Sequence, residues 1–258
     1  MPQSISAPAS VSDAHTKQPT LEGKRVLVTG GTTGIGRATA VLLASAGCNV
    51  FICGRDESHL ADALDRIGQV GTGDGMAIDL NAPSAVEALF DAAEKAWGGL
   101  DVVIVNAAVP ASDLAGTASA DLEYLVGVDF TAYLRTAREA AIRLGPGSDI
   151  VLVGSMSAVS QRPGSSVYVA AKTGIEGLAP ALRKELADQD IKVGLIEPGF
   201  TGADFQYPEF PPERQRALIH EHKMLRAEDI AVAIHFVLTQ PRRCAVSLMR
   251  VETRLTHP

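Results

Sequence analysis

The stretch VTGGTTGIGRA, residues 28–38, decides the fold of this chain. It follows the β-rich run RVLV at 25–28 and opens the helical pattern of 34–47. Ligands of open parallel sheets bind at the carboxyl ends of strands, where helix N-termini direct N–H groups at anions. A turn that lets a pyrophosphate approach the backbone needs glycine, and this one supplies Gly30, Gly34 and Gly36. Its context predicts a dinucleotide-binding turn, although glycines alone would also fit a plain strand–helix turn.

Strand and helix patterns alternate along the rest of the chain. Apolar runs without polar alternation, such as VVIV at 102–105, indicate strands that are covered on both faces. The predicted strands cover 25–28, 49–53, 75–79, 102–105, 150–154, 192–196 and 246–252. The predicted helices cover 34–47, 56–67, 82–97, 119–144, 165–188 and 226–238, and an irregular segment runs from 198 to about 212. This alternation predicts one α/β domain over residues 21–258, a doubly wound (Rossmann) fold with a parallel sheet of about seven strands and helices on both faces.

The composition limits what the chain can do. Of 258 residues, 46% are apolar and the net charge is −7, which argues against nucleic acid or an anionic membrane as the main partner. No apolar run approaches the roughly 18 residues that span a bilayer. Residues 1–20 are polar and lack the apolar core of a secretory signal, so we expect a flexible tail. Cys48, Cys53 and Cys244 lack C-x-x-C spacing, which predicts buried thiols in a reducing compartment, the cytoplasm.

The stretch GSMSAVSQRPGSSVYVAAK, residues 154–172, holds a serine, a tyrosine and a lysine at spacings that suit proton transfer. A carbonyl that gains a hydride also needs a proton, and tyrosine is too weak an acid unless a nearby cation lowers its pKa from about 10. Tyr168 and Lys172 are four residues apart on a predicted helix, so their side chains share one face. Ser155 ends the fifth predicted strand, at the edge where ligands bind, and can hydrogen-bond the same carbonyl oxygen. The alternative is that Y-x-x-x-K occurs on this helix by chance.

These motifs occur together in the order of a known family. Thr29–Gly36 has the pattern T-G-x-x-x-G-I-G, and Asn106-Ala107-Ala108 stands where the family has N-A-G. With the serine, the Y-x-x-x-K pair and Pro198-Gly199, the chain resembles the short-chain dehydrogenase/reductases over residues 22–253. By this resemblance the residues that bind the cofactor are Gly30, Thr32, Thr33, Gly34, Ile35, Gly36, Asp79, Leu80, Asn106, Ala107, Ala108, Tyr168, Lys172, Pro198, Gly199 and Thr201.

The resemblance also implies an activity. Tyr168 acts as the general acid in reduction and the general base in oxidation, Lys172 also binds the nicotinamide ribose, and Ser155 and Tyr168 bind the substrate. The implied enzyme is a ketoreductase that transfers a hydride between NADP(H) and a small ketone or aldehyde, or the matching alcohol. The chain end lacks the D-G-G tail of many relatives that reduce acyl-carrier substrates. The alternatives are a nicotinamide-binding sensor or scaffold with weak or no turnover, and an epimerase or dehydratase of the same fold.

The family assembles through its two long helices, which here correspond to the predicted helices at 119–144 and 165–188. We therefore expect a homotetramer or homodimer that binds a small carbonyl or alcohol, without nucleic acid or membrane as a partner.

Residues after the second predicted strand indicate the phosphorylated form of the cofactor. NAD-specific folds usually place an acid there, whereas an arginine accommodates the 2′-phosphate of NADP. Arg55 offers a planar, permanently charged fork, and Gly54 leaves room beside it. Asp56 comes one residue late and is expected to cap the next helix. We predict NADP(H), and the alternative is a solvated surface arginine.

Asp129 departs from the family pattern, because the resemblance places an asparagine there whose backbone carbonyl helps to hold a water near the lysine. On its predicted helix it shares the apolar stripe of Leu122, Leu125, Val126 and Tyr133. We therefore expect Asp129 to be at least partly buried and either protonated or paired, with Lys172 as the candidate partner. The hypothesis is retained catalysis with an altered pH profile, and the alternative is a tolerated structural replacement.

The substrate side of the site is less well defined by the sequence. Arg162 is interpreted either as a ligand for a substrate carboxylate or as a solvated loop residue. Residues 204–222 carry aromatic side chains, prolines and mixed charge, which fits a lid over the substrate or an ordinary surface excursion. Thr201 is the nearest hydroxyl to the place where the family binds the nicotinamide carboxamide with a threonine.

His220 and His222 suggest a pair of metal ligands. Two residues that lie two apart on a helix do not share a face, and the chemistry that the resemblance implies needs no metal. We therefore predict no metal site.

Overall fold

The strands of the chain form one parallel sheet in the order β3-β2-β1-β4-β5-β6-β7, in a computed structural model that describes residues 18–110, 113–202 and 211–255. The strands are β1 (Arg25–Val28), β2 (Asn49–Gly54), β3 (Thr72–Ala77), β4 (Val102–Val105), β5 (Asp149–Val153), β6 (Lys192–Pro198) and β7 (Leu248–Val251). The predicted doubly wound fold with seven strands is confirmed.

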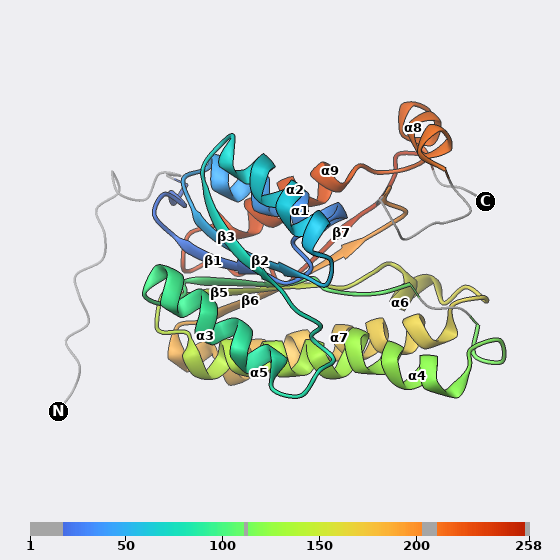
Figure 1. The fold of residues 1–258 in the computed structure, drawn as a ribbon, viewed down its shortest axis with the longest axis horizontal. Coiled ribbons are helices and arrows are strands. Elements are labelled where there is room, and N and C mark those ends of the chain that lie inside the picture. The colour runs from blue at the N-terminus through green and yellow to red at the C-terminus, as the bar shows by residue number, and fades with distance from the viewer. Residues whose placement is uncertain (1–17, 111–112, 203–210, 256–258) are drawn as a thin grey trace.

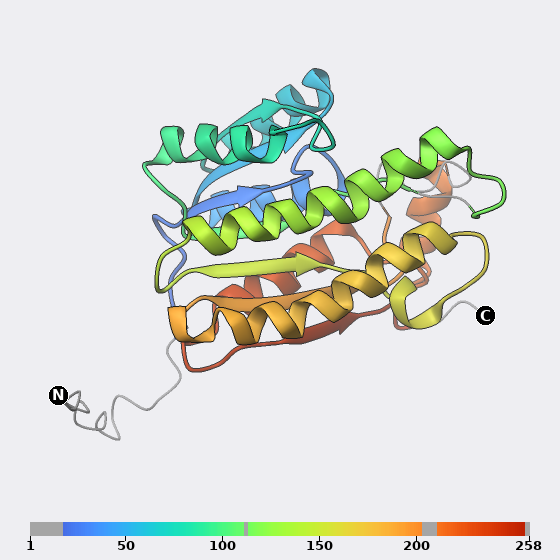
Figure 2. The ribbon, with the colours of Figure 1, turned by 90° about the horizontal axis from the view of Figure 1, so that it is seen from below.

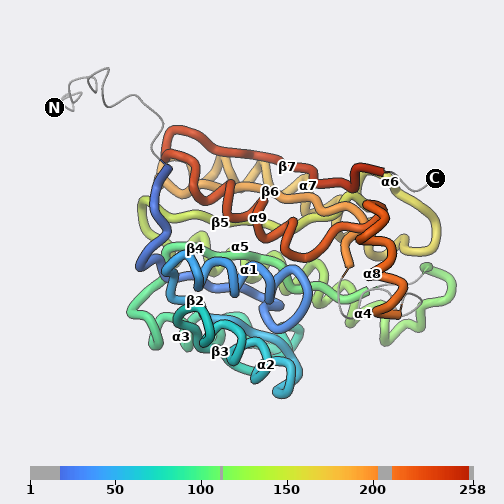
Figure 3. The backbone as a smooth tube through the Cα atoms, turned by 90° about the horizontal axis from the view of Figure 1, so that it is seen from above, coloured from blue at the N-terminus to red at the C-terminus, as the bar shows by residue number. Residues whose placement is uncertain are grey.

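Helices cover both faces of the sheet (Figures 1 and 3), with α1, α2 and α9 on one face and α3, α5 and α7 on the other. The helical segments are α1 (Gly34–Ser45), α2 (Glu57–Gly68), α3 (Ala85–Trp97), α4 (Ser119–Val126), η2 (Gly127–Ala132), α5 (Tyr133–Arg143), α6 (Ser157–Ser160), α7 (Ser166–Glu185), η3 (Ala187–Gln189), α8 (Pro212–His220) and α9 (Ala227–Leu238).

The alternation of side chains along each strand divides the core in two. In β1, Leu27 packs into the cluster that contains side chains of α3, α5 and α7, whereas Val26 and Val28 join the cluster of α1, α2 and α9. All four residues of β4 are buried, as the apolar run predicts. Each fully buried Val, Leu or Ile side chain contributes roughly 1.5–3 kcal/mol to folding, so the central strands hold the sheet rigidly beneath the site.

The predicted elements differ from the structure mainly where backbone pairing sets the ends of a strand or where a helix is locally distorted. Strand β3, predicted at 75–79, begins three residues earlier and ends two residues earlier, because its backbone pairs with β2 from Thr72 opposite Asn49 onwards. Its sequence TGDGMA has no apolar alternation that would mark these bounds. The helix expected at 119–144 runs on as one long helix (Figure 2), but its hydrogen-bond pattern changes to that of a π-helix in η2, between α4 and α5. Val126, placed on the apolar stripe by the sequence, is 40% exposed at the end of α4.

Other predictions concern the surface and the undescribed segments. Cys48 and Cys53 are buried as expected, but Cys244 is exposed. Helix α8 occupies much of the segment predicted as a lid, while residues 204–210, like most of the predicted tail at 1–20, lie outside the described residues. Within the described residues, no helix combines the length and the apolar character that crossing a membrane requires.

The order of the strands reverses between β1 and β4, because β1 lies between β2 and β4 in the sheet. In open parallel sheets ligands bind beyond the carboxyl ends of the strands at such a switch point. The connections that leave β1, β2, β4, β5 and β6 therefore define where a site should lie.

Candidate active site

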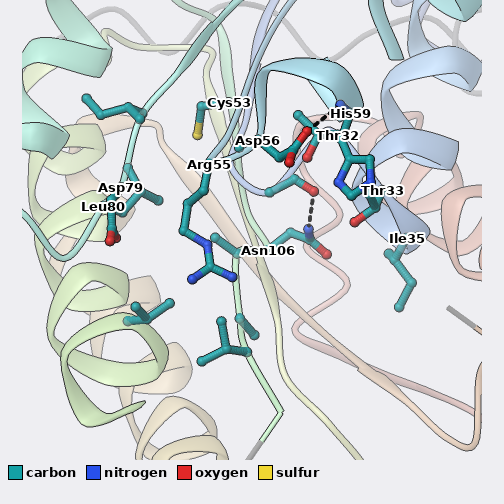
Figure 4. A pocket seen from close by; sticks show the side chains of 18 residues that line it. Thr32, Thr33, Ile35, Cys53, Arg55, Asp56, His59, Asp79, Leu80 and Asn106 are labelled. Carbon is teal, nitrogen blue, oxygen red and sulfur yellow. Dashed lines mark hydrogen bonds between the residues drawn. The ribbon is translucent and has the colours of Figure 1, made fainter. Parts of the chain in front are cut away.

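The larger of two adjoining cavities lies beyond the carboxyl ends of β1 to β4 and has a volume of about 490 Å³ (Figure 4). Most of the predicted cofactor residues line it: Gly30, Thr32, Thr33, Gly34, Ile35, Arg55, Asp79, Leu80, Asn106, Ala107 and Ala108. The structure therefore brings predicted residues from the connections after β1, β2, β3 and β4 together at the carboxyl ends of these strands.

The glycine turn has a backbone shape that side chains would prevent. Gly30 has a φ of +64°, and a Cβ on Gly36 would lie 2.0 Å from the carbonyl oxygen of Gly30. The side-chain amide of Asn106 donates to the carbonyl oxygens of Thr29 and Gly30 at 3.0 and 3.2 Å. In the described structure Thr33, which precedes α1, makes no side-chain cap, so backbone N–H groups of the first turn remain for an anion.

The residues after β2 behave partly as predicted. The carboxylate of Asp56 accepts hydrogen bonds from the N–H groups of Ser58 and His59, so Asp56 caps α2 as expected. The space beside Gly54 is not open, because a Cβ there would lie 2.3 Å from the hydroxyl of Thr32. A side chain at residue 54 would therefore collide with Thr32, whereas Gly54 itself lines the cavity beside Arg55.

The smaller cavity lies beyond the ends of β4, β5 and β6 and has a volume of about 180 Å³. It shares Ile35, Asn106 and Ala108 with the larger cavity, so the two cavities adjoin at the switch point. The predicted residues that line it are Ser155, Tyr168, Lys172, Pro198, Gly199 and Thr201. Serine, tyrosine and lysine, separated by up to 17 positions in sequence, thus face one small space.

Lys172 is a buried cation between two aromatic rings. Its Nζ lies 5.4 Å from the centre of the Tyr168 ring and 5.3 Å from that of Tyr133, and it donates to the carbonyl oxygen of Val153 at 3.0 Å. Burial lowers the pKa of Lys172 to about 8, against the smaller opposing effect of Asp129. The spacing prediction that Lys172 lies against Tyr168 agrees with this geometry.

Tyr133 lies next to Lys172, and its place in the site is not predicted from the sequence. Its buried hydroxyl donates to the carbonyl oxygen of Val105 at 2.7 Å and lies 3.2 Å from that of Val153. The signal in the sequence was its place four residues after Asp129 on the same apolar stripe. Tyr133 thus fixes the ends of β4 and β5 beneath Lys172.

Asp129 is buried as predicted, but its partner is different. Its Oδ1 accepts a hydrogen bond of 2.7 Å from the backbone N–H of Val109, and its Oδ2 has no hydrogen-bond partner among the described residues. Asp129 and Lys172 form no direct ion pair in the described structure, because each is bonded to a backbone group instead. Burial raises the pKa of Asp129 to about 6, although the Val109 hydrogen bond and the charge of Lys172 oppose that shift.

The remaining predicted residues lie in three settings. The hydroxyl of Ser155 lines the smaller cavity and accepts from the N–H of Ser157 at 3.1 Å. Thr201 is buried, and its hydroxyl donates to the carbonyl oxygen of Gly199 at 3.0 Å. Arg162 is exposed and lines neither cavity, so the structure does not bring it to the site as the substrate hypothesis expected.

In the part of the chain that the structure describes, no group of three acidic, His or Cys side chains is arranged to hold a metal ion.

A doubly wound sheet with a glycine turn at its switch point defines a dinucleotide-binding protein. A sequence profile for short chain dehydrogenases matches residues 24–214. The 3-oxoacyl-acyl-carrier-protein reductase FabG of Vibrio cholerae is 30% identical over 188 residues, which are 71% of this chain and 76% of that protein. An uncharacterized oxidoreductase of Staphylococcus aureus strain MRSA252 is 28% identical over 237 residues, 90% of this chain and 97% of that protein.

Solved structures agree with these matches. A short chain dehydrogenase from Burkholderia cenocepacia in complex with NADP superimposes with a TM-score of 0.81 at 29% identity, covering 91% of this chain and 98% of that chain. A dehydrogenase/reductase from Sinorhizobium meliloti gives 0.80 at 27% identity, covering 90% and 96%. The chain belongs to the short-chain dehydrogenase family of oxidoreductases, which use nicotinamide cofactors, and the resemblance drawn from its motifs is confirmed.

Proposed function

We propose that this protein transfers a hydride between NADP(H) and a small ketone or aldehyde, or the matching alcohol. The observation that carries the proposal is that the two cavities adjoin and share Ile35, Asn106 and Ala108 in their walls. A dinucleotide that begins beside the glycine turn and crosses this junction brings its nicotinamide next to Tyr168 and Lys172.

The residues of the larger cavity fit such a cofactor. The cradle between Gly30 and Gly36 is one that a side chain would fill, and first-turn N–H groups of α1 suit a pyrophosphate. Arg55, with Thr32 nearby at Gly54, provides donors for a 2′-phosphate, and Asp79 lies at the adenine end. The NADP complex of the Burkholderia relative supports the same choice of cofactor.

The residues of the smaller cavity supply the proton chemistry. A bound nicotinamide supplies or accepts the hydride at the carbonyl carbon. In reduction the hydroxyl of Tyr168 gives its proton to the carbonyl oxygen, so that hydride and proton together make the alcohol, and in oxidation Tyr168 takes that proton back. The ammonium of Lys172 beside the ring stabilises the phenolate, while the hydroxyl of Ser155 donates a hydrogen bond to the carbonyl oxygen.

The exposed side chains of the α4–α5 face support an oligomer, the homotetramer or homodimer that we also propose. α4 and α5 run end to end, with α7 alongside them on the outer face (Figure 2), and Val126, Leu134 and Ile142 in α4 and α5 are 40%, 36% and 61% exposed. Light scattering of the purified chain distinguishes these states from a monomer.

Turnover of carbonyl compounds tests the proposed activity. NADPH consumption is followed with a panel of ketones and aldehydes, and NADP reduction with the matching alcohols, for the wild type and Tyr168→Phe. We expect wild-type turnover that the variant lowers by about 10²–10⁴-fold, because only the proton donor is removed. Equal rates in the two proteins would contradict the role of Tyr168, and tight NADPH binding without turnover of any compound would favour the sensor or scaffold alternative.

A further inference from the structure

Arg55, the residue proposed to bind the 2′-phosphate, is held by a tyrosine from a distant helix. Its Nη1 donates a hydrogen bond to the hydroxyl of Tyr124 in α4, and its guanidinium carbon lies 5.7 Å from the centre of the Tyr124 ring. The two residues are 69 positions apart in the sequence. A directed hydrogen bond and a cation–π contact together restrict an otherwise flexible side chain on an exposed turn.

The hydroxyl of Tyr124 also contacts Asp79, which lines the cavity opposite Arg55 (Figure 4). It donates to Oδ2 of Asp79 at 3.4 Å, and Oδ1 of Asp79 accepts from the N–H of Asn81 at 3.0 Å. Burial raises the pKa of Tyr124, partly opposed by Arg55, so the phenol keeps the proton that it donates to Asp79 while it accepts from Arg55. Tyr124 therefore links the connections after β2 and β3 to α4.

The placement of Arg55 suits a phosphate at the adenosine end of the larger cavity. Figure 4 shows its side chain extending into the cavity, with Asp79 and Leu80 on one side and Asn106 on the other. Within the described residues, the bond to Tyr124 uses one N–H of the guanidinium fork and leaves the others for phosphate oxygens. A donor that is already oriented loses less conformational entropy when the ligand binds.

We propose that Tyr124 is a positioning residue for cofactor selection, which holds Arg55 in the orientation that binds the 2′-phosphate of NADP(H). This inference rests on the proposed function, because it assigns a partner to the residue that selects the cofactor there. Tyr124 itself does not line the cavity and acts through Arg55.

Equilibrium fluorescence titrations with NADPH and NADH test the inference without a known substrate. The proteins are the wild type, Tyr124→Phe, Tyr124→Leu, Arg55→Ala and the double variant Tyr124→Phe/Arg55→Ala. Glu123→Gln is the matched control, since Glu123 is exposed next to Tyr124 on α4 and neighbouring helix positions do not share a face. Circular dichroism of each variant verifies its fold.

We expect Tyr124→Phe to raise the Kd for NADPH by roughly three- to tenfold, the size of one lost hydrogen bond, and to raise the Kd for NADH much less, since NADH has no 2′-phosphate and shares only the contact with Asp79. Tyr124→Leu also removes the ring and should have a larger effect in the same direction. The double variant should match Arg55→Ala, and Glu123→Gln should match the wild type.

Three results would overturn the inference. Tyr124→Phe could leave NADPH binding unchanged or make it tighter, it could weaken both nucleotides equally, or it could weaken NADPH further in the Arg55→Ala background. If the wild type prefers NADPH and Arg55→Ala removes that preference, the first of these results rejects Tyr124 alone. If the wild type shows no preference, the proposed cofactor choice fails and the inference fails with it.

Discussion

The larger and the smaller cavity adjoin, but different kinds of residue form them. The larger cavity rests on backbone shape, with glycines at 30 and 36 where a side chain would collide and an amide of Asn106 bonded to the turn. The smaller cavity rests on charges inside the protein, where Asp129 and Lys172 are 1% and 2% exposed. The comparison teaches that the larger cavity depends on positions without a side chain, whereas the smaller cavity depends on how the buried charges are stabilised.

This contrast has an energetic consequence. The pKa values of Asp129 and Lys172 are shifted to about 6 and about 8, each toward the neutral form, and burial is the largest cause of both shifts. The folded chain therefore loses stability by burying these two groups. Glycines at the larger cavity instead cost chain entropy, a smaller and pH-independent penalty.

The largest expected effect on stability comes from removing the charge of Asp129. Because its pKa is raised from 3.8 to about 6, the folded chain keeps a proton between pH 4 and 6 that the unfolded chain has released. The wild type thus loses up to about 3 kcal/mol of unfolding free energy as the pH rises through this range. We expect Asp129→Asn to be more stable than the wild type at pH 7.5 by up to that amount and equally stable near pH 3.5, measured by urea unfolding.

The same variant sharpens the link to Lys172. The charge of Asp129 raises the pKa of Lys172, so its removal should move the alkaline limb of the pH–rate curve to lower pH. A stability difference that does not change with pH would show that Asp129 is not a buried titrating carboxylate. An unchanged pH–rate curve would favour the tolerated structural replacement.

A smaller effect is expected from filling the glycine turn. In Gly36→Ala the new methyl group would meet the carbonyl oxygen of Gly30, so we expect both NADPH and NADH to bind about tenfold more weakly. Gly177→Ala in α7 is the matched control, because its methyl group enters open space. The control should bind both nucleotides normally and gain roughly 0.5–1 kcal/mol of stability, measured by urea unfolding. Normal nucleotide binding by Gly36→Ala would contradict the role of the turn.

The sequence predicted the parts of the site that depend on local patterns, but not those that depend on contacts between distant segments. The glycine turn and the four-residue spacing of Tyr168 and Lys172 are local patterns, and the structure places those side chains as they predict. The partner of Asp129 is a backbone N–H of Val109, twenty positions earlier in the chain, and no local pattern indicates how that loop returns beside the helix.

Two details of the larger cavity were beyond sequence reasoning for the same reason. A side chain at residue 54 would meet Thr32, because the glycine turn lies against the end of β2, where Gly31 donates to the carbonyl oxygen of Cys53. The tyrosine that contacts Arg55 comes from α4, and its position depends on the packing of the whole domain. Spacing identifies residues on one element, whereas contacts between elements need the fold.

The most direct test of the central claim, that the larger cavity selects the cofactor and the smaller one carries the chemistry, is the ratio of Kd for NADH to Kd for NADPH in three proteins. Fluorescence titration of the wild type, Arg55→Ala and Tyr168→Phe gives this ratio without a substrate. We predict a ratio of about ten or more in the wild type and in Tyr168→Phe, falling to near one in Arg55→Ala, because charge-assisted hydrogen bonds to the phosphate are lost only there. A wild-type ratio near one, or a collapse of the ratio in Tyr168→Phe as well, would contradict the account.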